Sequence, residues 1–197
     1  MPVSIEDLKN ALKEEGIRAD LIVFGDDDSS QGGSDGPKDD ATINEFAGAL
    51  KLPRGRVLKT VTFLPEDSGA DKNASHPVLV VLRDLDRVNL PAVEARLELK
   101  LRLAKASEVR VLTGCKIGCV SPFGVNGAKV VLDEGIGDGD VILPAGSELF
   151  RAYLKVGFKN LLRLASRLNP EAVPLIFGAS EPSQNSNLFK VVTHREL

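Results

Sequence analysis

Six short aliphatic runs, separated by charged and turn-forming residues, limit the fold of this chain more than any other feature. They cover residues 21–24, 57–64, 78–82, 100–104, 129–133 and 140–146. Short runs rich in Val, Ile and Leu are typical of buried β-strands. Aromatic residues make up 5% of the chain and Trp is absent. The sequence therefore predicts a core built from aliphatic side chains.

Amphipathic segments lie between these runs. Apolar residues recur at helical spacing in residues 4–16, 42–50, 91–99, 107–114 and 149–168. Ser4 and Asp7 have the spacing of a capping box at the start of the first segment. Helices and strands do not alternate regularly, which disfavours a doubly wound parallel sheet. We expect an α+β fold with a mixed, partly closed, β-barrel-like sheet flanked by helices.

Charge is concentrated in one segment. Residues 25–40 hold six Asp and one Lys, a net charge of −5, so the rest of the chain carries +2 of the total of −3. This segment has no apolar side chain, and we interpret it as a mobile surface loop. A length of 197 residues fits one domain. The sequence predicts a single domain over residues 1–178 and a polar tail or linker over residues 179–197.

Several function classes lack their signatures. No apolar run reaches the roughly 20 residues of a membrane span, and the N-terminus does not resemble a secretory signal, so we expect a cytoplasmic protein. Cys115 and Cys119 are the two cysteines; without nearby histidines they do not form a zinc motif. Glycine-rich nucleotide fingerprints and a G-x-S-x-G elbow are also absent. We expect no metal and no cofactor.

Two features have the residue types of a binding site. Lys59 is a charge within the apolar run 57–64, and it either reaches solvent at a strand edge, pairs with a carboxylate, or lines a pocket for a phosphate or carbonyl. Residues 118–124, GCVSPFG, combine two glycines with a proline. Such a loop is either a tight turn before a strand or a nest of N–H groups for an oxyanion.

The order of these motifs resembles the YbaK-like family, the editing domains associated with prolyl-tRNA synthetases. The resemblance covers about residues 42–168 and is carried by Lys59-Thr60, by Thr113-Gly114 and by the GxxxP loop 118–122. It implies a mixed, barrel-like sheet and an aminoacyl-tRNA deacylase that hydrolyses the ester of mischarged tRNA(Pro). The expected partners are the acceptor end of tRNA(Pro) and prolyl-tRNA synthetase or a synthetase complex. An activated ester needs placement more than a nucleophilic side chain, which accounts for the missing triad.

The resemblance also implies site residues. The lysine of the family maps onto Lys59, which holds a phosphate or the substrate carbonyl. The catalytic set it implies is Lys59, Gly118, Cys119, Val120, Ser121 and Pro122. The substrate-binding set is Thr60, Thr113, Gly114, Phe123, Gly124, Gly146 and Ser147.

The sequence modestly favours Cys-tRNA(Pro) over Ala-tRNA(Pro) as the substrate. Thr60 follows the lysine as in the cysteine-type branch, and residues 125–133 lack the Asn-Asp pair of many alanine-type members. The alternative is a catalytically inactive, editing-like domain that binds tRNA or recruits a synthetase, and that was cut from a prolyl-tRNA synthetase.

A basic stripe is predicted on the last helix. Arg151, Lys155, Lys159, Arg163 and Arg167 recur every four residues, a spacing that drifts slowly around a helix. Lys155, Lys159 and Arg163 are the candidate tRNA-binding residues. The alternative is an ordinary solvated helix face.

Overall fold

The computed structural model describes residues 3–23, 51–66, 76–115, 117–145, 152–169 and 174–181. The acidic segment 25–40, the helix expected over 42–50, Gly146, Ser147 and Arg151 lie outside the described residues. The described helices are α1 (Ile5–Glu14), α3 (Leu90–Leu97), α4 (Ala106–Thr113) and α5 (Phe158–Leu168), with 3-10 turns at Arg54–Arg56 and Glu134–Ile136. The strands are β1 (Ala19–Val23), β2 (Leu58–Pro65), β3 (Val78–Arg83), β4 (Arg87–Val88), β5 (Leu101–Leu103), β6 (Lys129–Asp133), β7 (Asp140–Pro144), β8 (Ala152–Gly157), β9 (Leu175–Phe177) and β10 (Ser180–Glu181).

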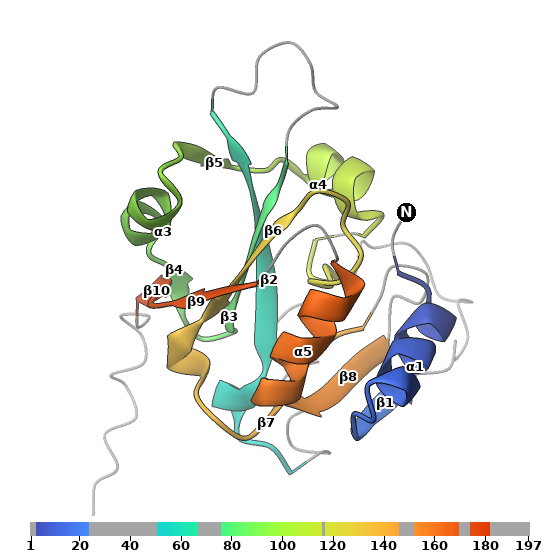
Figure 1. The fold of residues 1–197 in the computed structure, drawn as a ribbon. Coiled ribbons are helices and arrows are strands. Elements are labelled where there is room, and N and C mark those ends of the chain that lie inside the picture. The colour runs from blue at the N-terminus through green and yellow to red at the C-terminus, as the bar shows by residue number, and fades with distance from the viewer. Residues whose placement is uncertain are drawn as a thin grey trace, which may run out of the picture.

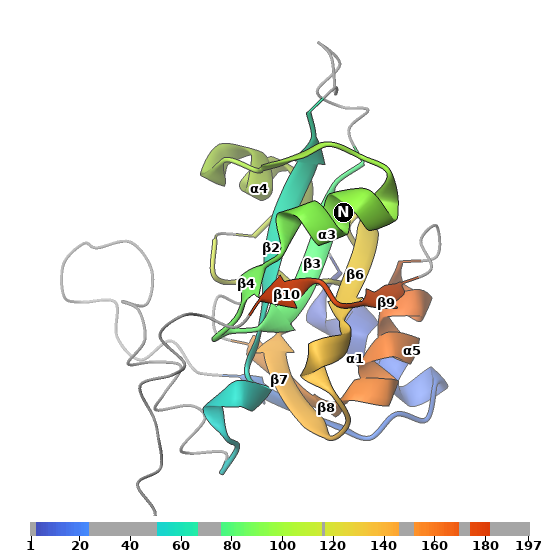
Figure 2. The same cartoon turned by 90° about the vertical axis from the view of Figure 1, so that its left-hand side faces the viewer.

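The larger sheet has the strand order β5-β2-β3-β6-β9. β2 is antiparallel to β3 and β5, whereas β6 is parallel to both β3 and β9. Side chains of β3 alternate between two cores. Val78, Val80 and Leu82 pack toward α3, and Leu79 and Val81 pack toward the opposite face. Figure 2 shows α3 lying across one face of this sheet. The predicted mixed α+β class is confirmed.

A second sheet, β1-β8-β7, is antiparallel and lies beside the first (Figure 1). A parallel bridge between Val57 and Ile142 joins the two sheets where β2 begins. Arg56 fixes this junction, because its guanidinium donates to the carbonyls of Ile136, Asp138 and Asp140 at 2.7–2.9 Å. Within the described strands the two sheets are therefore joined at this one junction and form a partly closed barrel, as expected. Together they enclose one aliphatic core.

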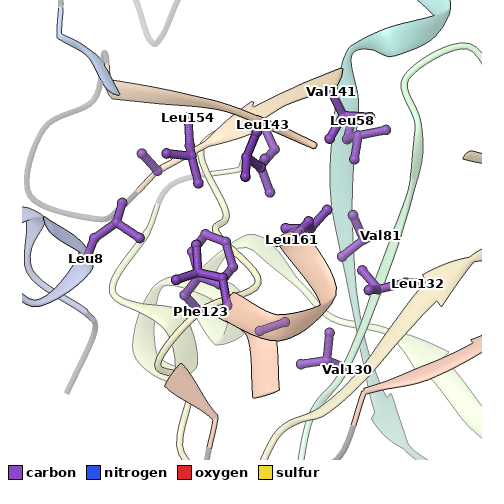
Figure 3. Packing of buried hydrophobic residues seen from close by; sticks show 14 of the residues in the cluster. Leu8, Leu58, Val81, Phe123, Val130, Leu132, Val141, Leu143, Leu154 and Leu161 are labelled. Carbon is purple, nitrogen blue, oxygen red and sulfur yellow. The ribbon is translucent and has the colours of Figure 1, made fainter. Parts of the chain in front are cut away.

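That core is lined by both sheets and covered by α1 and α5. Leu8 of α1 and Leu161 of α5 are fully buried in one cluster with Leu79, Leu132 and Leu154 of the strands, and Figure 3 shows part of this cluster. The predicted capping box starts α1: the Ser4 hydroxyl accepts from the Asp7 N–H, and the Asp7 carboxylate accepts from the Ser4 N–H. The aliphatic core predicted from the sequence is present.

The helix expected over residues 149–168 is wrong in its first part. Residues 152–157 form β8, and the helix α5 begins at Phe158. Ala152, Leu154 and Val156 alternate with more exposed residues, the period of a strand with one buried face. Pairing with β1 on one side and β7 on the other overrides the local helical preference. Lys155 thus lies on a strand, and the expected stripe does not run along one helix.

The described residues continue past the predicted end of the domain at 178. The buried carboxylate of Asp133 accepts hydrogen bonds from the Ala179 N–H at 2.8 Å and from the Ser180 hydroxyl at 2.7 Å. β10 then pairs with β4. Asp133 thus ties residues 179 and 180 to β6 of the larger sheet, while β10 and β4 form a separate two-stranded sheet.

Candidate active site

A cavity of about 320 Å³ lies along one edge of β2, between the two sheets. β2 contributes residues 58–62 to its lining, and the loop after α4 contributes Gly118 and Val120. Val109 of α4 and Tyr153 of β8 also line it. The structure therefore brings Lys59, Thr60, Gly118 and Val120, which lie about 60 residues apart in the sequence, to one cavity.

The edge of β2 is open here because β5 is short. Pairing with β5 covers Phe63, Leu64 and Pro65, and the Thr62 carbonyl accepts from the Ala104 N–H at 3.0 Å. Backbone groups of alternate strand residues point to the same side. The N–H and C=O of Thr60 therefore face the same edge as the Thr62 carbonyl, beyond the end of β5. Lys59 and Thr60 leave β2 on opposite faces, and both reach the cavity because it follows this edge.

Lys59 is half-buried, and its ammonium donates to the backbone carbonyl of Asp84 at 2.6 Å. Burial lowers the pKa of Lys59 below its ordinary value of 10.5, while the carboxylates of Asp84 and Asp86 raise this pKa. An ammonium carries three N–H donors in total. Of the alternatives left open by the sequence, lining a pocket agrees with the structure. The ammonium is held by the Asp84 carbonyl, and the charges of the Asp84 and Asp86 carboxylates act on it as well.

The loop at residues 118–124 has an exposed start and a buried end. Gly118 has a φ of +87° and lines the cavity, whereas the side chains from Cys119 to Phe123 are buried. The Ser121 hydroxyl accepts from the Phe123 N–H at 3.3 Å and so closes a local turn. Gly118 and Val120 thus form part of the cavity wall, and Cys119, Ser121 and Pro122 are buried beside them without lining the cavity. Their catalytic role stays a prediction.

Asn169 fixes the far end of this loop. Its side-chain oxygen accepts from the Gly124 N–H at 3.0 Å, and its side-chain nitrogen donates to the carbonyls of Pro122 and Ala165, each at 2.9 Å. Asn169 is 5% exposed and stands at the C-terminal end of α5. The helix that covers the main core therefore also holds the loop.

Four of the predicted substrate-binding residues support the site without lining the cavity. Thr113 is buried, and its hydroxyl donates to the Val109 carbonyl and accepts from the Cys115 N–H. Gly114 ends α4 in the left-handed conformation. Phe123 packs in the main core, and Gly124 lies against Val3. Substrate contact by these residues, as by Gly146 and Ser147, stays a prediction.

The sequence did not point to several residues that line the cavity, or to Asn169, which clamps the loop at residues 118–124. Thr62, Leu103, Val109, Ile117 and Tyr153 line the cavity, but each looks like an ordinary strand, helix or loop residue in the sequence. Asn169 follows the last helix with no motif around it. Tyr153 is the one tyrosine of the chain, a weak signal that would have needed the strand β8 to be recognised.

The candidate tRNA-binding residues are not among those that line the cavity, and each lies near an acidic side chain. The ammonium of Lys155 is 3.7 Å from Asp20 and 3.8 Å from Asp140, and that of Lys159 is 3.6 Å from Asp138. The Arg163 guanidinium is 3.0 Å from Glu15. Two of these three residues share a helix, and their contact with tRNA stays a prediction.

The family model of the aminoacyl-tRNA editing domain matches residues 38–155 of this chain. Because the match covers more than half of the chain, the chain belongs to the aminoacyl-tRNA editing domain family, as its motifs predict. Its enzyme class is accordingly that of the aminoacyl-tRNA deacylases.

No helix among the described residues is long and apolar enough to cross a bilayer.

Two proline–tRNA ligases are similar to part of the chain. The ligase of Pelotomaculum thermopropionicum is 29% identical over 96 residues, and that of Lactobacillus gasseri is 32% identical over 95 residues. Each match covers 47% of this chain and 15% of the ligase. The chain therefore corresponds to a small part of the length of these relatives.

Two solved structures share the fold. One, described as a candidate trans-editing enzyme for prolyl tRNA synthetase, has a TM-score of 0.61 and 24% identity, and covers 91% of this chain and 99% of its own. A hypothetical protein has a TM-score of 0.63 and 23% identity, with 88% and 99% covered. At this identity the likeness concerns the fold, and it agrees with the mixed α+β architecture.

Proposed function

We propose that this chain hydrolyses the ester of mischarged tRNA(Pro), with Cys-tRNA(Pro) favoured over Ala-tRNA(Pro). The observation that carries the proposal is the meeting of Lys59 with Gly118 and Val120 at one cavity. Support for tRNA(Pro) comes from the similarity to proline–tRNA ligases. Prolyl-tRNA synthetase is the partner that would supply such a substrate.

The chemistry needs little from protein acids and bases. An aminoacyl ester is activated, and water attack on its carbonyl carbon gives a tetrahedral oxyanion. Collapse of that intermediate breaks the bond to the ribose oxygen, which takes up the proton given up by the attacking water, and releases the free amino acid and the tRNA hydroxyl. In this proposal the Lys59 ammonium holds the terminal phosphate or the carbonyl oxygen as a point charge. Backbone groups around Gly118 orient the ester, so that placement and charge stabilisation supply most of the rate.

The open edge of β2 adds a further set of contacts to this proposal. The Thr60 carbonyl and N–H face the cavity edge, where the α-ammonium of an aminoacyl group can donate to a carbonyl. Such main-chain contacts do not depend on the amino-acid side chain. Discrimination between amino acids must then come from the part of the cavity that receives the side chain.

The test is deacylation of Cys-tRNA(Pro), Ala-tRNA(Pro) and correctly charged Pro-tRNA(Pro) by the wild type and by Lys59→Ala. We expect rapid loss of one mischarged species and its suppression in Lys59→Ala. The control is Lys9→Ala, since Lys9 is an exposed residue of α1. Binding of tRNA without hydrolysis of either mischarged species would contradict the proposal and favour the inactive, recruiting domain.

A further inference from the structure

Thr62 of β2 is a buried residue with a polar side chain. The residue is 4% exposed, and its Oγ1 has no hydrogen-bond partner among the described residues. The same holds for Oγ1 of Thr60, two residues earlier in β2, but Thr60 is less buried. Both threonines line the cavity.

An unpaired hydroxyl at this position opposes folding. Burying a hydroxyl without a partner is unfavourable, whereas valine has nearly the same shape and no polar group. The strands around Thr62 already use valine freely, at Val61 in β2 and at Val78, Val80 and Val81 in β3. The fold therefore gains nothing from a threonine here that a valine would not supply.

The hydroxyl is the polar group of an apolar part of the cavity. Leu103, Ala104, Val109 and Val120 line the cavity around the end of β2 that pairs with β5. The Thr62 carbonyl is engaged by the Ala104 N–H, which leaves the side chain as the group a ligand can meet. Lys59 precedes Thr62 by three residues in β2, a distance of roughly 10 Å at the rise of a strand. Its ammonium donates to the Asp84 carbonyl, and Asp84 is hydrogen-bonded to Val57, which lies before the start of β2 and further from Thr62. The cavity thus has a cationic end and a hydroxyl end.

We propose that Thr62 is a specificity-determining residue whose hydroxyl forms a hydrogen bond with the side chain of the aminoacyl group. The side chain selected is small and carries a hydroxyl or a thiol. An alanyl methyl group leaves the Thr62 hydroxyl unpaired, and a site built around a hydrogen bond discriminates against ligands that lack the partner. Pairing with β3 and β5 on either side of this part of β2 keeps the hydroxyl in place. This inference rests on the proposed deacylase function.

The experiment compares the wild type with Thr62→Val and Thr62→Ser on Ser-tRNA(Pro), Cys-tRNA(Pro) and Ala-tRNA(Pro). Thr62→Val keeps the shape and removes the hydroxyl, and Thr62→Ser keeps the hydroxyl and removes the methyl group. We expect Thr62→Val to lower kcat/KM for the seryl or cysteinyl substrate about ten-fold, the effect of losing one hydrogen bond. The alanyl substrate should be hydrolysed as before or faster, and Thr62→Ser should keep the preference of the wild type. The thermal midpoint of Thr62→Val should equal or exceed that of the wild type, which separates lost recognition from lost folding.

The outcomes distinguish this inference from the function on which it rests. Unchanged kcat/KM ratios in a folded, active Thr62→Val variant would overturn the role of Thr62 and leave the deacylase function intact. An equal loss of activity on all three substrates would also overturn it, because a selective hydrogen bond must distinguish them. Failure of the wild type to hydrolyse any of the three would contradict the proposed function and this inference together. A loss confined to the seryl or to the cysteinyl substrate identifies which polar group is recognised.

Discussion

The side chain of Asn169 donates a hydrogen bond of 2.9 Å to the backbone carbonyl of Pro122, across 47 residues of sequence. The same amide accepts from the Gly124 N–H, so it engages the loop on both sides of Phe123. A buried amide that satisfies both its oxygen and its nitrogen in this way holds a loop rigidly. The cavity wall at Gly118 and Val120 is therefore positioned from α5, the helix that also covers the main core.

Replacing Asn169 tests this clamp. We expect Asn169→Ala to lower the free energy of unfolding by about 2–4 kcal/mol, because three hydrogen bonds are lost and buried backbone groups are left unpaired. Activity should fall mainly through kcat, since the loop is displaced while the rest of the cavity remains. Urea unfolding and deacylation kinetics measure the two effects. Asn126→Ala is the control because Asn126 is exposed near the same loop, and equal effects of both variants would contradict the clamp.

The parts of the fold that sequence predicted are those whose signal is local. The strand β3 is a continuous run of buried aliphatic residues, and the start of α1 has its capping box within four residues. The strand β8 was missed because its alternation runs directly into the period of α5, and its stability depends on β1, more than 120 residues earlier. The boundary between the strand and the helix, at Gly157 and Phe158, is visible only in the folded chain.

The site divides in the same way. Lys59 stands out in the sequence because a charge interrupts an apolar run, and the glycines and proline of the loop mark an unusual backbone path. Thr62 and Asn169 have no such local contrast. Their importance comes from burial, from an unpaired hydroxyl in one case and three hydrogen bonds in the other. These properties arise from contacts between distant segments.

Two glycines of the loop should respond differently to alanine. Gly118 has a φ of +87° with open space where a Cβ would lie, so Gly118→Ala should cost about 1–2 kcal/mol from backbone strain alone. Gly124 has a φ of +67°, and its added Cβ would overlap the Val3 side chain. Gly124→Ala should therefore destabilise the protein more than Gly118→Ala. Gly118 lies at the cavity wall, so Gly118→Ala should reduce activity more than its loss of stability alone would explain. Thermal or urea unfolding with parallel kinetics checks this order, and the reverse order would count against the described loop.

The half-buried ammonium of Lys59 should make stability depend on alkaline pH. Burial lowers the pKa of Lys59 below 10.5 in the folded state, so between the lowered pKa and 10.5 the unfolded chain binds more protons than the folded chain. Folded stability attributable to this group therefore rises as the pH increases through that range. Lys59→Met should be inactive and more stable than the wild type at neutral pH, with the difference narrowing toward pH 10.5. Urea unfolding of both proteins over this range measures it, and a difference that does not change with pH would contradict the assignment.

The ion pair between Arg102 and Glu108 should make stability rise with pH in the acidic range as well. The guanidinium donates to both carboxylate oxygens at 2.8 Å, and the Lys105 N–H donates to the same carboxylate, also at 2.8 Å. Hydrogen bonding to Arg102 and to that N–H lowers the pKa of Glu108 from 4.5 to about 2. The stabilisation is therefore complete above pH 4.5 and is lost as the pH falls toward about 2. This pair joins β5 to α4, both of which line the cavity.

Glu108→Gln isolates that contribution, because the amide keeps the size of the side chain and loses its charge. The difference in unfolding free energy between the wild type and Glu108→Gln should be constant from pH 7 to about 5 and should shrink between pH 4.5 and about 2. Glu98→Gln serves as the control for the change from glutamate to glutamine, since Glu98 is an exposed glutamate that ends α3. Loss of activity in Glu108→Gln at pH 7 with little change in stability would show that the pair sets the position of α4 at the cavity. A difference between wild type and Glu108→Gln that persists unchanged at pH 2 would show that the ion pair does not carry the stabilisation.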